Sequence, residues 1–239
     1  MKVHVLAVAA HPDDVELNCA GTILRHLDLG YSAGIIDLTQ GELGTRGSGP
    51  LRLNEASRAA EILGVSFREN LGMADGFFRN TKENQLQLIR KIRQFQPDII
   101  LTNALSDRHP DHGRAARLVT DACFLAGLVK VETVDENGNP QVRWKPNSLY
   151  YFIQDYFHIP NLIVDVSKYM EKRMKALKTF TSQFYNPGSN EPDSSISSHD
   201  YLEQILGRAR TFGRQIGVEF GEGFTVQRAI GARDLMTLI

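Results

Sequence analysis

The chain of 239 residues is 42% hydrophobic and 23% charged, a composition typical of a globular protein with one sizeable core. Its 27 basic and 28 acidic residues leave a formal net charge of −1, so no overall field attracts nucleic acid or an anionic membrane. The two cysteines, Cys19 and Cys123, exclude a disulfide framework and a thiolate metal site, and they fit a reducing compartment.

The sequence also argues against a membrane or secreted protein. No stretch approaches the roughly 20 apolar residues that cross a bilayer. The N-terminal apolar run is too short, and too soon followed by charge, to be a signal sequence. We therefore expect one soluble domain over residues 1–239, located in the cytoplasm, with neither a nucleic-acid nor a membrane partner.

Strand-like and helix-like periodicities alternate along the first half of the chain. They predict strands at residues 3–9, 33–38, 65–71 and 98–102, and helices at residues 16–29, 52–63, 83–95 and 113–125. Cys19 and Cys123 fall inside two of these helices. Such alternation predicts an α/β fold with a mostly parallel, doubly wound sheet flanked by helices.

The second half of the chain has a looser pattern. Strands are expected at residues 149–153 and 162–166, and helices at residues 170–180 and 201–216, before a small C-terminal extension. Residues 186–198 are rich in Pro, Gly, Ser and Asn and have almost nothing to bury, which is typical of a mobile loop. The loop is either a lid over a site or a surface excursion.

Two similar polar clusters each follow a predicted buried strand. They are His11-Pro12-Asp13-Asp14 and His109-Pro110-Asp111-His112. In open α/β sheets, ligands bind beyond the carboxyl ends of the strands. The two clusters therefore predict a single site, although each could instead be a polar turn that caps the next helix.

The residue types in these clusters match a catalytic zinc site, which takes three protein ligands and leaves a fourth position open. His11, Asp14 and His112 can supply the three ligands, and iron or cobalt accepts the same ligand types. Adjacent carboxylates on a turn diverge, so Asp13 is free to act as the general base for the attacking water.

His109 and Asp111 complete the predicted catalytic group. His109 lies three residues before His112, close enough to donate a proton or to stabilise an oxyanion. Asp111 can accept a hydrogen bond from a histidine ring and fix its tautomer. These roles are compatible with hydrolysis by acyl transfer.

Other functional classes fit the sequence less well. The glycine-rich loop at residues 41–49 lacks the Lys-Ser/Thr ending of a phosphate-binding loop, and no Gly-x-Ser-x-Gly motif is present. The alternatives that remain are a non-catalytic metal-binding or sugar-binding module and a metal-dependent phosphoesterase. Neither would release an amine from an N-acetylglucosaminide.

The two clusters closely resemble the signature motifs of the LmbE-like or PIG-L family of zinc-dependent N-acetylglucosaminide deacetylases. Further segments resemble the branch that contains the bacillithiol biosynthesis deacetylases. These segments are residues 37–44, Arg52 with Glu55 and Ala56, residues 63–65, and Ser182-Gln183-Phe184. The resemblance covers most of the chain and implies one deacetylase domain with a Rossmann-like fold.

The resemblance also implies roles for named residues. It implies Zn²⁺ on His11, Asp14 and His112, with Asp13 as base and His109 as acid or oxyanion partner. It further implies a homo-oligomer, because members of the family are often oligomers, including hexamers.

The substrate that the resemblance implies is small. In the bacillithiol branch it is N-acetylglucosaminyl malate, whereas other relatives act on chitin oligomers or mycothiol-type conjugates. Arg52 is implied to contact the substrate through a carboxylate or a sugar hydroxyl, and Asp75 and Tyr201 to lie at the sugar pocket. An anionic malate would be met by a basic residue such as Arg52 or Arg46.

Overall fold

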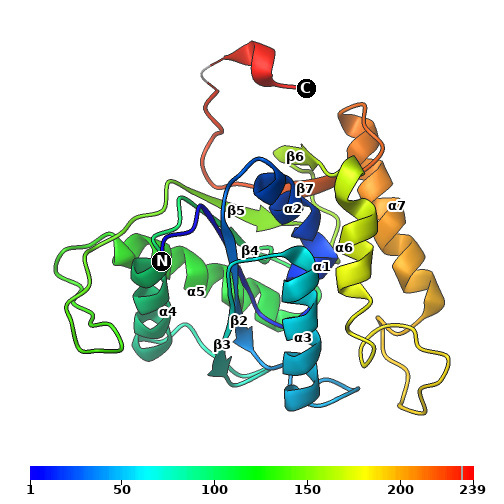
Figure 1. The fold of residues 1–239 in the computed structure, drawn as a ribbon, viewed down its shortest axis with the longest axis horizontal. Coiled ribbons are helices and arrows are strands. Elements are labelled where there is room, and N and C mark those ends of the chain that lie inside the picture. The colour runs from blue at the N-terminus through cyan, green and yellow to red at the C-terminus, as the bar shows by residue number, and fades with distance from the viewer. Residues whose placement is uncertain (233) are drawn as a thin grey trace.

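The structure is a computed structural model that describes residues 1–232 and 234–239, in which one sheet lies between two layers of helices (Figure 1). The first half of the chain contains β1 (Val5–Ala9), α1 (Asp14–Asn18), α2 (Ala20–Asp28), β2 (Ala33–Thr39), α3 (Gly49–Leu63), β3 (Arg68–Met73), α4 (Lys82–Phe95), β4 (Ile99–Thr102) and α5 (Pro110–Ala126). The second half contains β5 (Ser148–Phe152), β6 (Leu162–Asp165), η1 (Ser167–Tyr169), α6 (Met170–Leu177), α7 (His199–Gln215), β7 (Gly221–Thr225) and η2 (Leu235–Thr237).

The described strands form a sheet in the order β3-β2-β1-β4-β5-β7-β6. The pairs from β3 to β5 are parallel, whereas β7 runs antiparallel to both β5 and β6. The predicted α/β, doubly wound and mostly parallel sheet is therefore confirmed. The chain order reverses at β1, whose neighbours are β2 and β4, and open α/β sheets bind ligands at such a point.

β7 was not predicted, because its sequence, which contains two glycines and a glutamate, lacks the apolar pattern of a strand. Glu222 is a charged residue in a buried position, and Gly223 lies against the ring of Phe212. A Cβ on Gly223 would come within 2.9 Å of that ring, so the close packing requires glycine.

Alternate residues of the strands face two separate cores. Val5, Ala7 and Ala9 of β1 pack with residues of α1, α2, α3, α6 and α7. Leu6 and Val8 pack with residues of α4 and α5 on the other face. Because both faces of β1 are covered, the polar residues that follow it leave the sheet at its carboxyl edge.

The predicted helix at residues 16–29 is wrong in one respect, because it is broken into α1 and α2 at Cys19. Cys19 has φ −143°, outside the helical range, and so is not inside a helix as predicted. The guanidinium of Arg173 donates to the carbonyl oxygens of Glu16 and Leu17, which α1 would otherwise use to continue. The break turns α1 into a short separate helix that carries Asp14.

Glu222 of β7 closes the start of α2 from the other side of the break. Its carboxylate accepts hydrogen bonds from the backbone N–H groups of Gly21 at 2.9 Å and Thr22 at 2.7 Å. It also lies 3.4 Å from the Nε of Arg173. A carboxylate at a helix N-terminus satisfies unpaired N–H groups and interacts favourably with the helix dipole.

Two other helices begin earlier than predicted. α3 begins at Gly49 rather than residue 52, because the Ser48 side chain caps it. α5 begins at Pro110 rather than residue 113, and His109 is its N-cap. Asp111 and His112 therefore lie in the first turn of a helix.

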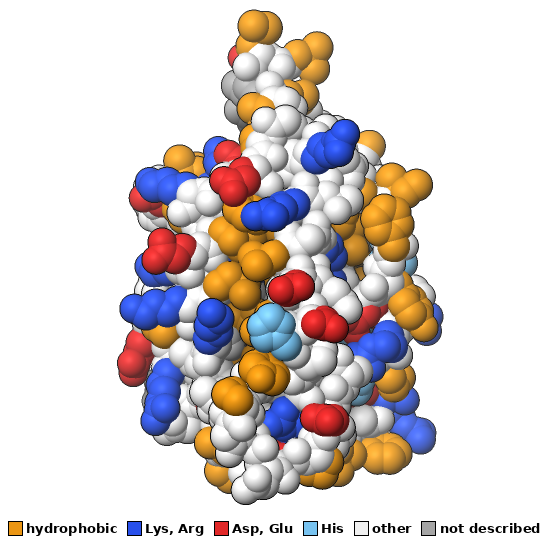
Figure 2. Space-filling view, turned by 90° about the vertical axis from the view of Figure 1, so that its right-hand side faces the viewer, with side chains coloured by type: hydrophobic (Ala, Val, Ile, Leu, Met, Phe, Trp, Pro, Cys, Tyr) orange, Lys and Arg blue, Asp and Glu red, His pale blue; other side chains and the backbone are white. Residues whose placement is uncertain are grey.

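The C-terminal extension leaves the body of the protein after β7 (Figure 1). Figure 2 shows it projecting from the molecule with apolar side chains near its end. Leu235, Met236, Leu238 and Ile239 are all exposed there. In the part of the chain that the structure describes, no helix is both long and apolar enough to cross a membrane.

Replacing Glu222 with alanine removes the carboxylate that Gly21, Thr22 and Arg173 share. Removing one partner of a buried ion pair costs about 3–5 kcal/mol, so we expect a loss of that size in the free energy of unfolding measured with urea. The matched control is Glu219→Ala at an exposed carboxylate, which should change it by less than about 0.5 kcal/mol. Equal effects of the two substitutions would contradict the capping role.

Candidate metal centre and active site

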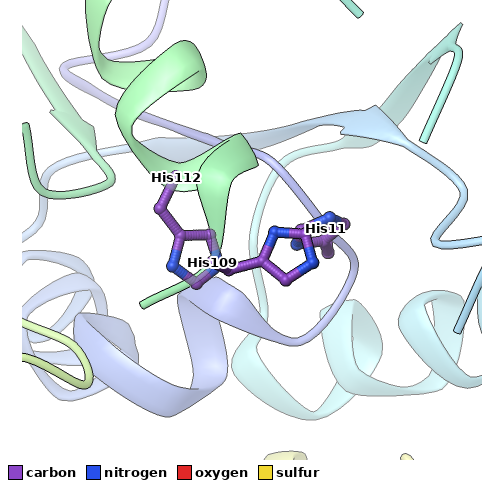
Figure 3. Close-up of side chains that lie close together, drawn as sticks. All are labelled: His11, His109 and His112. Atoms are coloured by element: carbon purple, nitrogen blue, oxygen red, sulfur yellow. The ribbon is translucent and has the colours of Figure 1, made fainter. Parts of the chain in front are cut away.

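The two polar clusters meet at the carboxyl edge of the sheet, as predicted. β1 and β4 are parallel neighbours, with Val5 opposite Ile99, so the turns that follow them lie side by side. Figure 3 shows His109 and His112 at the start of α5 with their rings close to that of His11, which comes from the turn after β1. The ring centroids of His11 and His109 are 4.6 Å apart, and those of His109 and His112 are 5.2 Å apart.

His11, Asp14 and His112 form a buried group. Oδ1 of Asp14 lies 3.3 Å from Nε2 of His112, and its Oδ2 lies 3.6 Å from Nδ1 of His11. All three side chains are less than a tenth exposed. The three predicted metal ligands are therefore brought together, with one nitrogen of each ring turned toward Asp14.

The other nitrogen of each ring is held by a further carboxylate. Nδ1 of His112 lies 2.6 Å from Asp107, and Nε2 of His11 lies 3.0 Å from Asp75 and 3.5 Å from Asp111. Histidines that bind metals commonly donate their second N–H in this way, which fixes the tautomer. The arrangement leaves Nδ1 of His11 and Nε2 of His112 as the nitrogens that a metal would take.

The electrostatics of this group also favour a cation. Burial lowers the pKa of His112, but Asp14 and Asp107 outweigh it and raise the pKa to about 9. In His11, burial is likewise outweighed by Asp111, Asp14 and Asp75, which raise its pKa well above the ordinary value. The surrounding carboxylates thus stabilise positive charge on both rings, and a divalent cation between the rings would supply that charge instead.

Among the described residues, two sets of ligand atoms lie within 4.8 Å of one another: His11 with His109 and His112, and His11 with Asp75 and Asp111. In the second set, Asp75 and Asp111 already hold the ring of His11. Asp111 also accepts from Gly76 N–H at 2.7 Å and lies 2.6 Å from Nη1 of Arg114. His11, Asp14 and His112 fit a catalytic zinc site better, because these residues combine two imidazoles with one carboxylate.

Asp13 lies beside this group in an unusual backbone conformation. Its φ is +117°, where a residue other than glycine is strained. It stands at the N-cap position of α1, but its side chain makes no capping hydrogen bond. Burial raises the pKa of Asp13 to about 7, although the nearby Arg52 guanidinium lowers it.

Arg52 reaches Asp13 from α3. Its Nη2 lies 3.0 Å from Oδ2 of Asp13 and donates to the carbonyl of Pro12 at 2.6 Å, while Nη1 donates to the carbonyl of Gly41 at 3.2 Å. Gly41 has φ +65°, and a Cβ on it would lie 1.8 Å from Nη1 of Arg52, so this approach requires glycine. The terminal nitrogens of Arg52 are thus engaged with the protein itself.

A cavity of about 240 Å³ opens beside these residues. Asp13, Asp14, His11, His109, His112, Arg52 and Tyr201 all line it. Asp75 and Asp111 do not line it. The structure therefore places Tyr201 and Arg52 at the predicted pocket and Asp75 at the ring of His11 instead.

His109 is half-buried at the cavity wall. Its Nδ1 accepts a hydrogen bond from the N–H of Asp111 at 3.2 Å, so its proton is assigned to Nε2. Burial, together with the charges of His11 and His112, lowers its pKa. His109 is thus a neutral donor, and it serves both as a helix cap and as a wall of the site.

The sequence reasoning missed three residues that hold the ligands. Asn103 and Gln154 both donate to the carboxylate of Asp14, at 3.0 and 2.7 Å, and Asp107 holds His112. Asn103 and Gln154 come shortly after the ends of β4 and β5. These two residues could have been found from the sequence, because each follows a buried strand, and the same position identified His11 as a site residue.

A family model and two relatives of known description all match this chain as N-deacetylases. The family model described as PIG-L, GlcNAc-PI de-N-acetylase, matches residues 6–123. The chain is 34% identical to a diacetylchitobiose deacetylase of Thermococcus kodakarensis, over 92% of this chain and 81% of that protein. It is 27% identical to a probable N-acetyl-alpha-D-glucosaminyl L-malate deacetylase 2 of Bacillus anthracis, over 76% of this chain and 81% of that protein.

A relative with a different activity is a 4-oxalmesaconate hydratase of Pseudomonas putida, 25% identical over 74% of this chain and 73% of that protein. Among solved structures, a conserved protein of Thermus thermophilus has a TM-score of 0.86 and 31% identity, and the match covers 98% of both chains. The match to the family model, the site and the identity to these relatives agree. The chain belongs to the PIG-L family of N-deacetylases.

Proposed function

We propose that this enzyme hydrolyses the acetamide of an N-acetylglucosamine conjugate to acetate and a free amine. The observation that carries the proposal is the position of Asp13. It lines the cavity beside the group of two histidines and Asp14, yet its own carboxylate pairs with Arg52. A carboxylate so placed can act as a base, and the deacetylases named above support the sugar substrate.

His11, Asp14 and His112 would hold the metal, for which we propose Zn²⁺, with Fe²⁺ accepting the same ligand types. When bound there, the metal supplies a Lewis acid for the amide carbonyl and lowers the pKa of water. Asp107 holds the ring of His112, and Asp75 and Asp111 hold that of His11.

The remaining side chains divide the acid–base work. Asp13 takes the proton of the attacking water and returns it to the amide nitrogen as the C–N bond breaks, and Arg52 keeps its carboxylate in place. His109 donates from Nε2 to the carbonyl oxygen as negative charge develops there. Tyr201, which is stacked on Phe184 with ring centroids 6.3 Å apart, packs against the sugar.

For the conjugate we propose N-acetylglucosaminyl malate, with diacetylchitobiose as the alternative. We further propose a single catalytic domain that assembles into a homo-oligomer in the cytoplasm, with a hexamer as the first state to look for. The exposed apolar residues of η2 and the two buried free cysteines support the assembly and the reducing compartment.

Acetate release tests the proposed function directly. The zinc-loaded protein should release acetate and amine in equal amounts from N-acetylglucosaminyl malate, diacetylchitobiose or both. Assays of 4-oxalmesaconate hydration and of phosphoester hydrolysis run on the same preparation as controls. Activity in either control without acetate release would contradict the proposal, as would sugar binding with no turnover.

Asp13→Asn separates the base from the ligands. Asparagine keeps the shape and one oxygen for Arg52 but cannot take a proton, so we expect kcat to fall by about 10²–10⁴-fold with the zinc content unchanged. His112→Ala should instead lose the metal. An Asp13→Asn protein that is loaded with zinc and fully active would contradict the assignment of the base.

Asp107→Asn tests how the ligand His112 is held. The amide cannot offer a negative charge to Nδ1 of His112, so we expect zinc affinity, measured by competition with a chelator, to weaken about 10–100-fold. Asp155→Asn is the matched control, because this nearby carboxylate pairs with Arg108 and not with a histidine. Equal zinc affinities of the two variants would exclude the role of Asp107.

A further inference from the structure

Arg46, on the glycine-rich loop before α3, is buried without hydrogen bonds to its guanidinium. The residue is 5% exposed, and its Nε has no hydrogen-bond partner. Among the described residues, no hydrogen bond uses the terminal nitrogens either. The guanidinium forms an ion pair with the half-exposed Glu191, whose Oε2 lies 3.7 Å from Nε. Buried arginines ordinarily satisfy their five donors, because unpaired ones cost stability.

The backbone of Arg46, by contrast, is held firmly. Its carbonyl accepts a hydrogen bond from Nε2 of Gln183 at 2.8 Å, and Gln183 also donates to Oγ of Ser182. Ser182 is in turn fixed by the buried carboxylate of Glu55 on α3, through its N–H at 2.8 Å and its Oγ at 2.7 Å. This chain of polar contacts gives the Ser182-Gln183 motif a structural purpose, which is to position Arg46.

The loop at residues 186–198 supports the same arginine from another direction. Both carboxylate oxygens of Glu191 lie 3.1 Å from the N–H of Gly47. Farther along the loop, Ser194, Ser195 and Ile196 line the cavity together with Arg46. Most of this loop is exposed, as expected, but Ile196 is partly buried against the core and Ser197 is 4% exposed.

Arg46 differs from the other arginines of the cavity. Arg52 is bonded to Asp13 and to two carbonyls, and Arg108 donates to Asp155 at 2.9 Å and is half-exposed. Only Arg46, among the described arginines of the cavity wall, has a buried guanidinium with no hydrogen bond. Because a guanidinium matches the geometry of carboxylates and phosphates, such an arginine is prepared for an acidic oxygen of a ligand.

We propose that Arg46 is a specificity-determining residue that binds an acidic group, a carboxylate or a phosphate, on the substituent attached to the N-acetylglucosamine. The inference rests on the proposed function for the identity of the sugar. Arg46, rather than Arg52, then recognises the substituent. Residues 182–183 and the loop at residues 186–198 hold Arg46 at the cavity wall.

The test compares one ligand with and without its charge. N-acetylglucosaminyl malate and its dimethyl ester are titrated calorimetrically into metal-depleted protein, so that neither turnover nor chelation of zinc by malate contributes. We expect the native protein to bind the acid at least tenfold more tightly than the ester. In Arg46→Gln this preference should fall to less than threefold, through weaker binding of the acid alone.

Two variants control the experiment. Arg58→Gln removes the same charge from an exposed position on α3 and should keep the full preference. Arg46→Lys keeps the positive charge but lacks the planar guanidinium, and it should retain part of the preference for the acid over the ester. An N-acetylglucosaminyl phosphate ester in place of the malate distinguishes a carboxylate from a phosphate as the preferred acidic group.

A native protein that binds acid and ester equally would overturn the proposal, and this comparison stands even if Arg46→Gln does not fold. Equal losses for acid and ester in a folded Arg46→Gln would also overturn it. Because these are binding measurements without metal, they are independent of acetate release. A preference for the acid without any deacetylation would refute the proposed function and leave the binding role of Arg46 in place.

Discussion

The buried side-chain amide of Asn103 joins the ends of three neighbouring strands. Its Oδ1 accepts from the N–H of Ala10 after β1, at 2.9 Å, and its Nδ2 donates both to Asp14 at 3.0 Å and to Gln154 after β5 at 3.2 Å. Asn103 itself follows β4 and is fully buried. The relative position of the two histidine clusters therefore depends on hydrogen bonds whose loss would leave buried polar groups unpaired.

Around this amide the protein concentrates charge that it does not expose to water. Asp13, Asp14, Asp107 and Asp111 are all held within hydrogen-bond networks beside two imidazoles. Arg52 pairs with Asp13 and Arg114 with Asp111. Burial of so many carboxylates is costly unless positive charge is supplied. The buried carboxylates therefore affect both stability and function. They lower the stability of the fold when no positive charge is near, and they are suited to binding a cation.

The fold and much of the site could be predicted from the sequence, because local patterns determine them. Buried strands followed by polar turns identified both clusters, and the parallel pairing of β1 with β4 brought them together. The break at Cys19 could not be predicted, because it depends on Arg173 and Glu222, which are more than 150 residues away in sequence.

The same limit applies to Asp75 and Arg52. Both were expected from family resemblance at the substrate. Arg52 lines the cavity and is also bonded to Asp13, whereas Asp75 is bonded to His11. The local sequence does not indicate which of several polar groups from other segments a side chain will form a hydrogen bond with. β7 was missed for a related reason, since Glu222 and Gly223 are explained only by the partners that surround them.

Anomalous diffraction at the zinc edge, from crystals of the zinc-loaded protein, tests whether His11, Asp14 and His112 hold the metal. We expect one peak about 2.0–2.2 Å from Nδ1 of His11, Nε2 of His112 and a carboxylate oxygen of Asp14. A peak bound by His109 in place of Asp14, or between His11, Asp75 and Asp111, would contradict it.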